Sequence, residues 1–220
     1  IVFYRSVIEG AQTAPIDALC DALAARGLSV SALYIASLKD TASRALIAAA
    51  WGEAPLDVIL NATAFAVGDE TQDPLARFDC PVLQVTLAGS SEEDWQQSSR
   101  GLAAKDLAMS IVLPELDGRI ATRAISFKAD ALWHARSACR IVTYKPVDDR
   151  IAFVADLSAN WAALRHTPAG DRKTAIILAN YPNKDGRIAN GVGYDTPAST
   201  TVAPTTAVPT AALIIQIASG

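Results

Sequence analysis

The chain has 220 residues, of which 51% are hydrophobic and 19% are charged, and its formal net charge is −4. That apolar content excludes a disordered chain, and the acidic balance provides no basic surface for nucleic acid. Three cysteines and two histidines, none in a C-x-x-C or H-x-x-H spacing, exclude a disulfide framework and a zinc knuckle, so we expect a reducing, cytoplasmic setting.

Apolar runs in the first half of the chain predict four buried strands, over residues 1–6, 28–36, 56–63 and 80–88. Between the first two, Thr13 can cap a helix, Pro15 can open it and Gly27 can end it. Asp40 can cap another helix that ends near Trp51. Because strands that alternate with helices pair in parallel, we expect an α/β fold with a doubly wound, mostly parallel sheet of flavodoxin-like type.

A second α/β pattern begins near residue 149. It consists of a helix over residues 153–166 and strands over residues 173–180 and 212–217. In the helix, Leu157, Trp161 and Leu164 are expected to share the buried face. We therefore predict an α/β domain over residues 1–148, followed over residues 149–220 by a linker helix and the truncated start of a second α/β domain.

The end of the chain carries one more helix-start pattern, in which Asp195 can cap a helix and Pro197 can open it. Residues 196–220 have no charge, but Pro204, Pro209 and many threonines make them too polar and too broken for a membrane span. The chain begins without an initiator methionine or a signal peptide, so we expect an internal fragment of a longer protein.

Polar residues stand where the predicted strands end, and ligands of open α/β sheets bind beyond those carboxyl ends. They are Arg5 and Ser6 after the first strand, Asn61 and Thr63 in the third, and Gln84 in the fourth. Arg5 and Ser6 form either an anion site or an ordinary polar strand end, and Asn61 binds either a ligand or its own backbone. The residues alone leave these alternatives open.

The segment PELDG, residues 114–118, places two carboxylates beside a proline and a glycine. This composition is typical of a surface turn, which is the first interpretation. In the second interpretation Glu115, which follows an apolar stretch, is partly buried where the chain leaves the core and is thereby suited to proton abstraction.

Two nucleotide-binding motifs are absent from the sequence. The glycines of GRIANGVGYD, residues 186–195, do not follow the G-x-G-x-x-G spacing, and the chain has no G-x-x-x-x-G-K-[ST] segment. Hydrolysis of ATP by this chain is therefore not expected.

Seven sequence blocks together resemble the large subunit of aerobic cobaltochelatase, the CobN family. They are YRS (4–6), SLKD (37–40), LNATAFA (60–66), PVLQV (81–85), RGLAAKDLAMSIVLPELDGRI (100–120), SFK (126–128) and ANYPNKDGRIANGVGYDTPAS (179–199). The related magnesium chelatase large subunit shares a version of the LPELDG block, but NATAFA and NGVGYDTPAS are nearer to the cobalt branch. The resemblance ends after Ser199.

The resemblance implies a fragment of a subunit that binds a tetrapyrrole and hosts metal insertion. In the cobalt branch, Co(II) enters hydrogenobyrinic acid a,c-diamide during cobalamin biosynthesis, and separate AAA+ partner subunits hydrolyse ATP. Cobalt is thus a substrate, and neither nucleic acid nor a membrane is an expected partner. The alternatives are a magnesium chelatase large subunit, which inserts magnesium into protoporphyrin IX, and a non-catalytic α/β module that binds a ligand or docks a partner.

Metal insertion removes two protons from ring nitrogens and replaces the water ligands of the metal, so it requires a base and weak oxygen donors. The resemblance makes Glu115 the candidate base or transient metal donor, whereas Asp117 is expected to shape the turn. No residue is assigned as a permanent metal ligand. The candidates for binding substrate carboxylates and the cleft rim are Arg5, Ser6, Asn61, Thr63, Gln84, Arg119, Lys128, Arg187 and Asn190.

Overall fold

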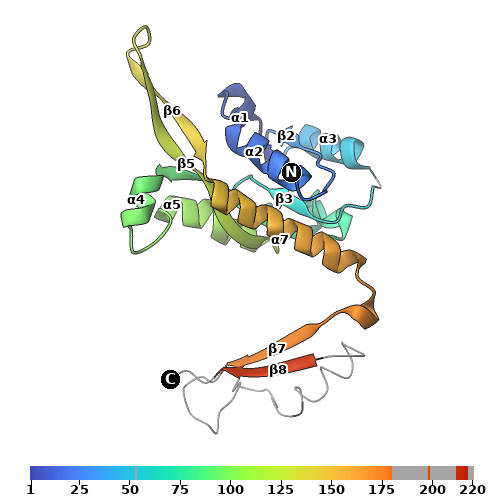
Figure 1. Ribbon diagram of the computed structural model, residues 1–220. Coiled ribbons are helices and arrows are strands. Elements are labelled where there is room, and N and C mark those ends of the chain that lie inside the picture. The colour runs from blue at the N-terminus through green and yellow to red at the C-terminus, as the bar shows by residue number, and fades with distance from the viewer. Residues whose placement is uncertain (53, 180–197, 199–211, 218–220) are drawn as a thin grey trace. The chain divides into compact units, whose positions relative to one another are not determined.

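The computed structural model describes residues 1–52, 54–179, 198 and 212–217 (Figure 1). The chain divides into two units, Ile1–Ala162 and Ala163–Gly220, and each is described by itself. Within the described residues, no helix is long and apolar enough to cross a membrane.

A six-stranded sheet forms the centre of the first unit, in the order β2-β1-β3-β4-β5-β6. The strands are β1 (Val2–Tyr4), β2 (Leu33–Ile35), β3 (Ile59–Asn61), β4 (Val82–Ser91), β5 (Ile120–His134) and β6 (Cys139–Pro146). The first five are parallel, and β6 runs antiparallel to β5. The order 2-1-3-4-5 is that of the flavodoxin-like arrangement, so the predicted fold class is confirmed.

The helices of this unit are α1 (Arg5–Glu9), α2 (Ala14–Ala24), α3 (Thr41–Trp51), α4 (Glu92–Gln97), α5 (Ala104–Leu107), α6 (Leu113–Glu115) and α7 (Asp148–His166), with single 3₁₀ turns at Glu70–Gln72 and Ala76–Phe78. The predicted cap at Asp40 is confirmed, since its side chain accepts a hydrogen bond from the Ser43 amide at 2.8 Å. Thr13 directly precedes α2 and Pro15 stands in its first turn, but the Thr13 side chain makes no capping hydrogen bond. The short helix α1 was not predicted.

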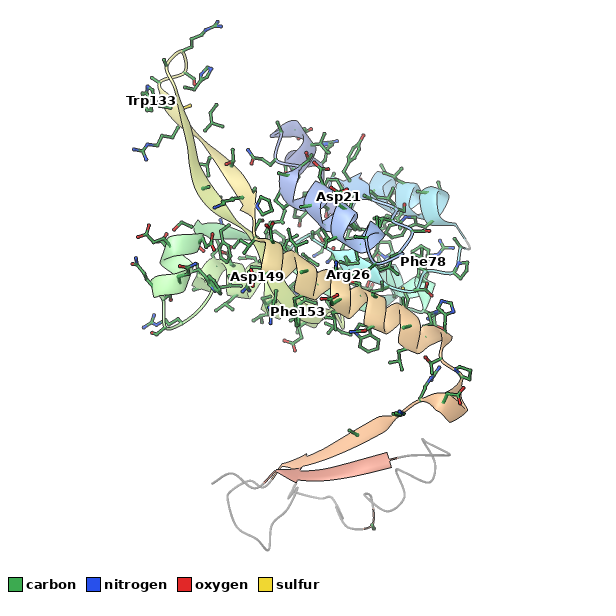
Figure 2. All side chains as sticks on the ribbon, viewed as in Figure 1. Asp21, Arg26, Phe78, Trp133, Asp149 and Phe153 are labelled. Atoms are coloured by element: carbon green, nitrogen blue, oxygen red, sulfur yellow. The ribbon has the colours of Figure 1, made fainter. Side chains whose placement is uncertain are left out.

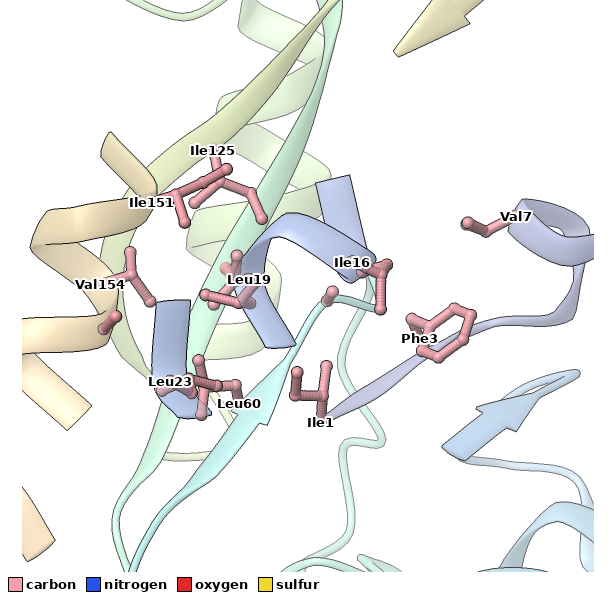
Figure 3. Close-up of a cluster of buried hydrophobic side chains, with 13 residues drawn as sticks. Ile1, Phe3, Val7, Ile16, Leu19, Leu23, Leu60, Ile125, Ile151 and Val154 are labelled. Carbon is pink, nitrogen blue, oxygen red and sulfur yellow. The ribbon is translucent and has the colours of Figure 1, made fainter. Parts of the chain in front are cut away.

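Helices cover both faces of the sheet. On one face, α2 and α7 pack over the strands through buried side chains such as Leu19, Leu60 and Val154 (Figure 3). On the other face, Ile47 and Trp51 of α3 pack with strand residues and with the segment that leads into β4. A sheet covered on both faces can bury strands with continuous apolar runs, which is the pattern that predicted them.

Side chains of α7 and α2 share one apolar cluster, and an ion pair also joins the two helices. The Arg26 guanidinium, just beyond α2, donates to a carboxylate oxygen of Asp156 on α7 at 2.6 Å, and Figure 2 labels Arg26 beside this helix. Helix α7 up to Ala162 belongs to the first unit, whereas the sequence had suggested a linker helix outside the first domain.

The predicted buried face of α7 is wrong. The buried residues are Ile151, Val154, Ala155, Ser158 and Ala162, whereas Leu164 is 45% exposed. The buried face combines Ile151 and Val154 with the small residues Ala155, Ser158 and Ala162, so the pattern of larger apolar residues did not identify it. The large residues thus lie toward the rim.

The segment before β5 is helical up to Glu115. A π-helical turn, Ala108–Val112, connects α5 to α6, and Pro114 stands in the first turn of α6. Proline has no amide hydrogen to donate, and its ring clashes with a carbonyl group of the preceding turn. The wider π-helical turn relieves that clash. The apolar stretch therefore continues as a helix across the sheet.

The second unit contains a parallel pair of strands, β7 (Thr174–Ala179) and β8 (Ala212–Ile217), and a 3₁₀ turn at Ala169–Asp171. Both strands were predicted and are confirmed. The predicted helix start at Asp195 and Pro197 lies outside the described residues.

Candidate functional site

At the carboxyl edge of the sheet, a side chain at the end of β1 bonds to the segment after β3, at the switch point between these two strands. The Tyr4 hydroxyl donates to the Ala64 carbonyl oxygen at 2.9 Å and accepts from the Ala64 amide at 3.1 Å. Burial raises the pKa of Tyr4 above its ordinary value of 10.0. This neutral bridge ties the end of β1 to the segment that follows β3, at the position where ligands of this fold class bind.

Arg5 and Ser6 lie at this edge, as their sequence positions predicted, on the exposed first turn of α1. The Arg5 guanidinium lies 3.0 Å from the Glu9 carboxylate, one helical turn away, and both side chains are more than half exposed. Such an exposed pair is weak, so an anionic ligand can compete for the arginine.

Asn61, Thr63 and Gln84 are brought together as predicted, but their side chains bond mainly to one another. Asn61 Nδ2 donates to Gln84 Oε1 at 2.8 Å, and Asn61 Oδ1 accepts from the Thr63 hydroxyl at 2.7 Å. Gln84 Nε2 donates to the Thr63 carbonyl oxygen at 2.6 Å. All three residues are at most 2% exposed, so this polar network holds the end of β3 against β4.

Phe65, which follows the end of β3, is singled out by its backbone and its exposure. Its φ of 68° is in the left-handed region, which non-glycine residues seldom adopt, and its side chain is 52% exposed. The Phe65 amide donates to the Met109 carbonyl oxygen at 2.8 Å, which holds the strained residue in place. Only coordinates reveal such a backbone, because nothing in NATAFA demands a positive φ.

Glu115 does not lie where the sequence analysis expected it. The turn after Glu115 leads into β5, whose first residue Ile120 pairs with Leu83 near the start of β4. Glu115 therefore lies toward the amino ends of these strands, on the opposite edge from Arg5 and Ser6. It is exposed, so the expected partial burial is wrong; Pro114 is the buried residue of the pair. Its catalytic role stays a prediction.

Arg119 belongs to a buried group of charges behind this turn. Its Nη2 lies 2.7 Å from Asp73 Oδ2, as an ion pair without hydrogen-bond alignment, and 3.9 Å from Asp117 Oδ2. Asp117 also accepts from the Val67 and Gly68 amides at 2.6 and 2.9 Å. Asp117 thus anchors the turn to a distant loop. Arg119 is 4% exposed and already faces two carboxylates, so its charge is compensated internally.

A cavity of about 660 Å³ lies beside these charges. Its lining includes Asp73, Asp117 and Arg119 together with Cys80 and Val82. It opens near the start of β4, and the candidate base Glu115 does not line it.

Lys128 lies in a larger cleft, of about 770 Å³, between α4 and the root of the β5–β6 hairpin. The lining combines Lys128 and Lys145 with acidic residues of α4, among them Glu92. This cleft is at the carboxyl end of β4, since Ser91 pairs with Lys128. Lys128, which the sequence analysis had named, is thus exposed on the wall of this cleft.

Aromatic packing supports the root of the hairpin. The rings of Trp95 and Phe127 lie 5.0 Å apart, and the Arg150 guanidinium is 4.5 Å from the centre of the Trp95 ring. Trp95 is therefore a packing residue.

Asp106 is a buried residue that the sequence analysis missed. Its Oδ2 accepts from the Gly89 amide at 2.9 Å. Burial, and secondarily the charge of Asp106, raise the pKa of Tyr144 above 10.0. Nearby on β4 and β5, the Thr86 and Ser126 hydroxyls are buried without a hydrogen-bond partner in the described part of the chain. The part of β4 and β5 that lies next to α5 therefore carries buried polar side chains.

The remaining predicted residues, Arg187 and Asn190, lie outside the described residues. In the part of the chain that the structure describes, no group of three or more His, Cys, Asp or Glu side chains converges as a metal site. The described candidates thus lie in three separate places. They are the switch point between β1 and β3, the turn of residues 115–119 at the amino edge of the sheet, and the root of the β5–β6 hairpin.

Comparison with known proteins places these features in context. A family model described as CobN/magnesium chelatase matches residues 1–203. The aerobic cobaltochelatase subunit CobN of Sinorhizobium sp is 46% identical over 204 residues, which cover 91% of this chain and 16% of that protein. The protein of the same name from Pseudomonas aeruginosa is 42% identical over 201 residues, covering 90% of this chain and 16% of the relative.

More distant likenesses agree. A magnesium-chelatase subunit of Rhodobacter capsulatus is 26% identical over 203 residues, covering 84% of this chain and 17% of that protein. The solved structure of the catalytic subunit of cobaltochelatase from Mycobacterium tuberculosis matches with a TM-score of 0.72 and 27% identity, covering 91% of this chain and 17% of that chain. The chain therefore spans about one sixth of the length of the curated relatives it matches.

Proposed function

The chain belongs to the CobN/magnesium chelatase family, and on that premise we propose that it is part of the tetrapyrrole-binding, metal-inserting large subunit of an ATP-dependent cobaltochelatase. The observation that carries the proposal is the 46% identity to an aerobic cobaltochelatase subunit CobN, against 26% to a magnesium-chelatase subunit over a similar length. The proposed substrates are Co(II) and hydrogenobyrinic acid a,c-diamide, in a cytoplasmic step of cobalamin biosynthesis.

ATP hydrolysis and metal insertion are assigned to different subunits. The sequence has no phosphate-binding G-x-x-x-x-G-K-[ST] loop, so ATP hydrolysis is assigned to AAA+ partner subunits. This chain supplies groups that hold the macrocycle and assist the exchange of two protons for the metal.

The geometry sorts the candidate residues by role. Arg5, Ser6 and Lys128 are exposed, and we assign them to the carboxylates of the substrate. The polar network of Asn61, Thr63 and Gln84, and the paired Arg119, act by positioning the segments beside them, because their own polar groups already have partners. Arg187 and Asn190 keep their predicted binding role.

Glu115 is the proposed base or transient metal donor. Its exposure leaves the carboxylate oxygens accessible to a metal ion that still carries water ligands, while the buried Asp117 and Arg119 hold the turn. A single exposed carboxylate binds a divalent cation weakly. Weak binding suits a donor that must later release the metal ion to the macrocycle.

The test is Glu115→Gln in the full-length protein, assayed with its partner subunits and ATP. We expect tetrapyrrole binding to be retained and cobalt insertion to fall about 10²- to 10⁴-fold. Asp21→Asn, an exposed carboxylate on α2, is the matched control and should insert cobalt normally. Normal insertion by Glu115→Gln would remove this residue from the mechanism.

The magnesium branch is the nearest alternative within the family. Titration of the full-length protein with hydrogenobyrinic acid a,c-diamide and with protoporphyrin IX separates the two, since each branch must bind its own macrocycle more tightly. Preference for protoporphyrin IX would contradict the cobalt assignment.

A non-catalytic module is the other candidate, and two observations favour it. Glu115 is exposed at the amino edge, away from the switch point, and the polar network at the end of β3 is bonded internally. In that case every single substitution among the candidates would leave cobalt insertion intact while the assembly of the complex changes.

A further inference from the structure

The β5–β6 hairpin extends beyond the body of the first unit as an arm, defined here as residues 128–145 (Figure 1). It exposes three large apolar side chains: Trp133 is 61% exposed, and Ile141 and Val142 are each 44% exposed. Figure 2 shows Trp133 near the outer end. Isolated exposed apolar residues are ordinary, but a group of three on one thin hairpin is costly in water and indicates a binding surface.

The arm is also basic, in contrast to the rest of the chain. It contains four Lys or Arg residues and one Asp, a net charge of +3, whereas the whole chain has a net charge of −4. The surface therefore fits an occupant that is both apolar and anionic.

The strand register places an aromatic ring and cations on one face of the arm. Trp133 pairs directly with Arg140, and Lys128 pairs with Tyr144. Alternate residues of β6 point to the same side, so Arg140, Val142 and Tyr144 share one face. On β5 a register shift between Asp130 and Trp133 separates the two pairs. Opposite residues of an antiparallel pair lie about 5 Å apart, which allows Trp133 and Arg140 to contact one ligand together.

The arm is held in a defined position at its root. The side-chain amide of Gln12 donates to the Val142 carbonyl oxygen at 3.0 Å and accepts from the Tyr144 amide at 2.8 Å. On the inner side, the face leads into the 770 Å³ cleft, whose lining combines Lys128, Val142 and Lys145 with the acidic residues Glu92, Glu93 and Asp94. A ligand on the arm thus meets a preformed concave surface as well as an exposed ring.

We propose that this face of the arm binds the tetrapyrrole macrocycle, with Trp133 against the apolar ring and Arg140 and Lys128 paired with its peripheral carboxylates. The inference rests on the proposed function, because the family's substrate supplies the occupant. A conjugated ring with an anionic margin has the chemistry that the arm offers: an aromatic face beside guanidinium and ammonium groups.

The experiment is a titration of the full-length protein with hydrogenobyrinic acid a,c-diamide, followed by the absorbance change of the tetrapyrrole. We expect Trp133→Ala to weaken binding about tenfold and Trp133→Phe to restore most of the affinity, because an aromatic ring is retained. Arg140→Glu combined with Lys128→Glu should weaken binding further and reduce its dependence on salt concentration. Lys105→Glu, on the exposed surface of α5, is the matched charge control and should bind normally.

The outcomes separate this inference from the proposed function. If the wild-type protein binds the tetrapyrrole and the arm variants bind it equally well, the inference is overturned and the proposed function stands. If the variants bind normally but no longer assemble with the ATPase partners, the arm docks a protein instead, which also overturns the inference. A wild-type protein that binds no tetrapyrrole would contradict both.

Discussion

The first unit uses charged residues in opposite ways at the amino-edge turn and in the arm. At the turn, Arg119 is 4% exposed and lies between the carboxylates of Asp73 and Asp117. In the arm, Lys128 is exposed on the wall of a cleft, and the arm also exposes large apolar side chains to solvent. The turn charges compensate one another inside the fold, so removing one sign is expected to destabilise it. We expect the arm to contribute less to stability than the turn, because its charged and large apolar side chains are exposed.

Removing the buried charge of the turn should give the largest effect. Arg119→Met leaves Asp73 and Asp117 buried without their cation, which is expected to cost about 3–5 kcal/mol. The free energy of unfolding, measured by urea denaturation, should fall by that amount. The same substitution in the arm, Arg136→Met, is the matched control. Equal losses in both variants would mean that the turn charges are no more structural than those of the arm.

The polar network at the end of β3 should give the next largest effect. Gln84→Ala removes the partner of Asn61 Nδ2 and of the Thr63 carbonyl oxygen, so about 1–3 kcal/mol of stability should be lost for each buried group left unsatisfied. Asn61→Ala combined with Gln84→Ala should cost less than the sum of the single changes, because they share a bond. The exposed Gln96→Ala should change the unfolding free energy by less than 0.5 kcal/mol, about the limit for surface positions.

A smaller, pH-limited effect is expected at the cap of α3. Hydrogen bonds from the Ser43 side chain and amide lower the pKa of Asp40 below its ordinary value of 3.8. The cap therefore stabilises the fold above that pH, and the contribution is lost as the pH falls through the lower, folded-state pKa. The stability difference between wild type and Asp40→Asn should shrink between pH 7 and pH 3. A constant difference over that range would show that the carboxylate charge is not what matters.

The smallest effect on stability is expected from the arm itself. Trp133→Ala should change the unfolding free energy by at most about 0.5 kcal/mol, because the ring is mostly exposed. A loss of several kcal/mol would show that Trp133 packs as a core residue, and the contrast between the arm and the turn would disappear. Thermal unfolding of the same protein used for the binding titration provides this measurement.

Local sequence patterns were sufficient for the alternating part of the fold. The apolar runs that became β1 to β4, and the start signals at Thr13 and Asp40, predicted the elements because each is set by neighbouring residues. The hairpin was missed because its turn, residues 135–138, has no glycine or asparagine. Ala138 adopts a φ of 46° there, which its side chain does not favour.

The candidate site was predictable only as a set of residues, since its geometry depends on tertiary packing. The pairing of β3 with β4 in a parallel sheet brings Asn61 and Thr63 near Gln84, but their mutual bonding depends on side-chain directions. Glu115 was misplaced because the preceding apolar stretch is a helix that carries it toward the amino edge. A π-helical turn before a proline has no sequence signature that would have shown this.

The side chain of Gln12 has a consequence for how the arm can meet other chains. Its carboxamide bonds the Val142 carbonyl and the Tyr144 amide as one residue of a neighbouring strand would. A further strand therefore cannot be added to β6 along this stretch, which protects the edge against template-like aggregation. Only the backbone outward of Val142 remains available for β-augmentation, so an extended peptide could join the sheet there alone.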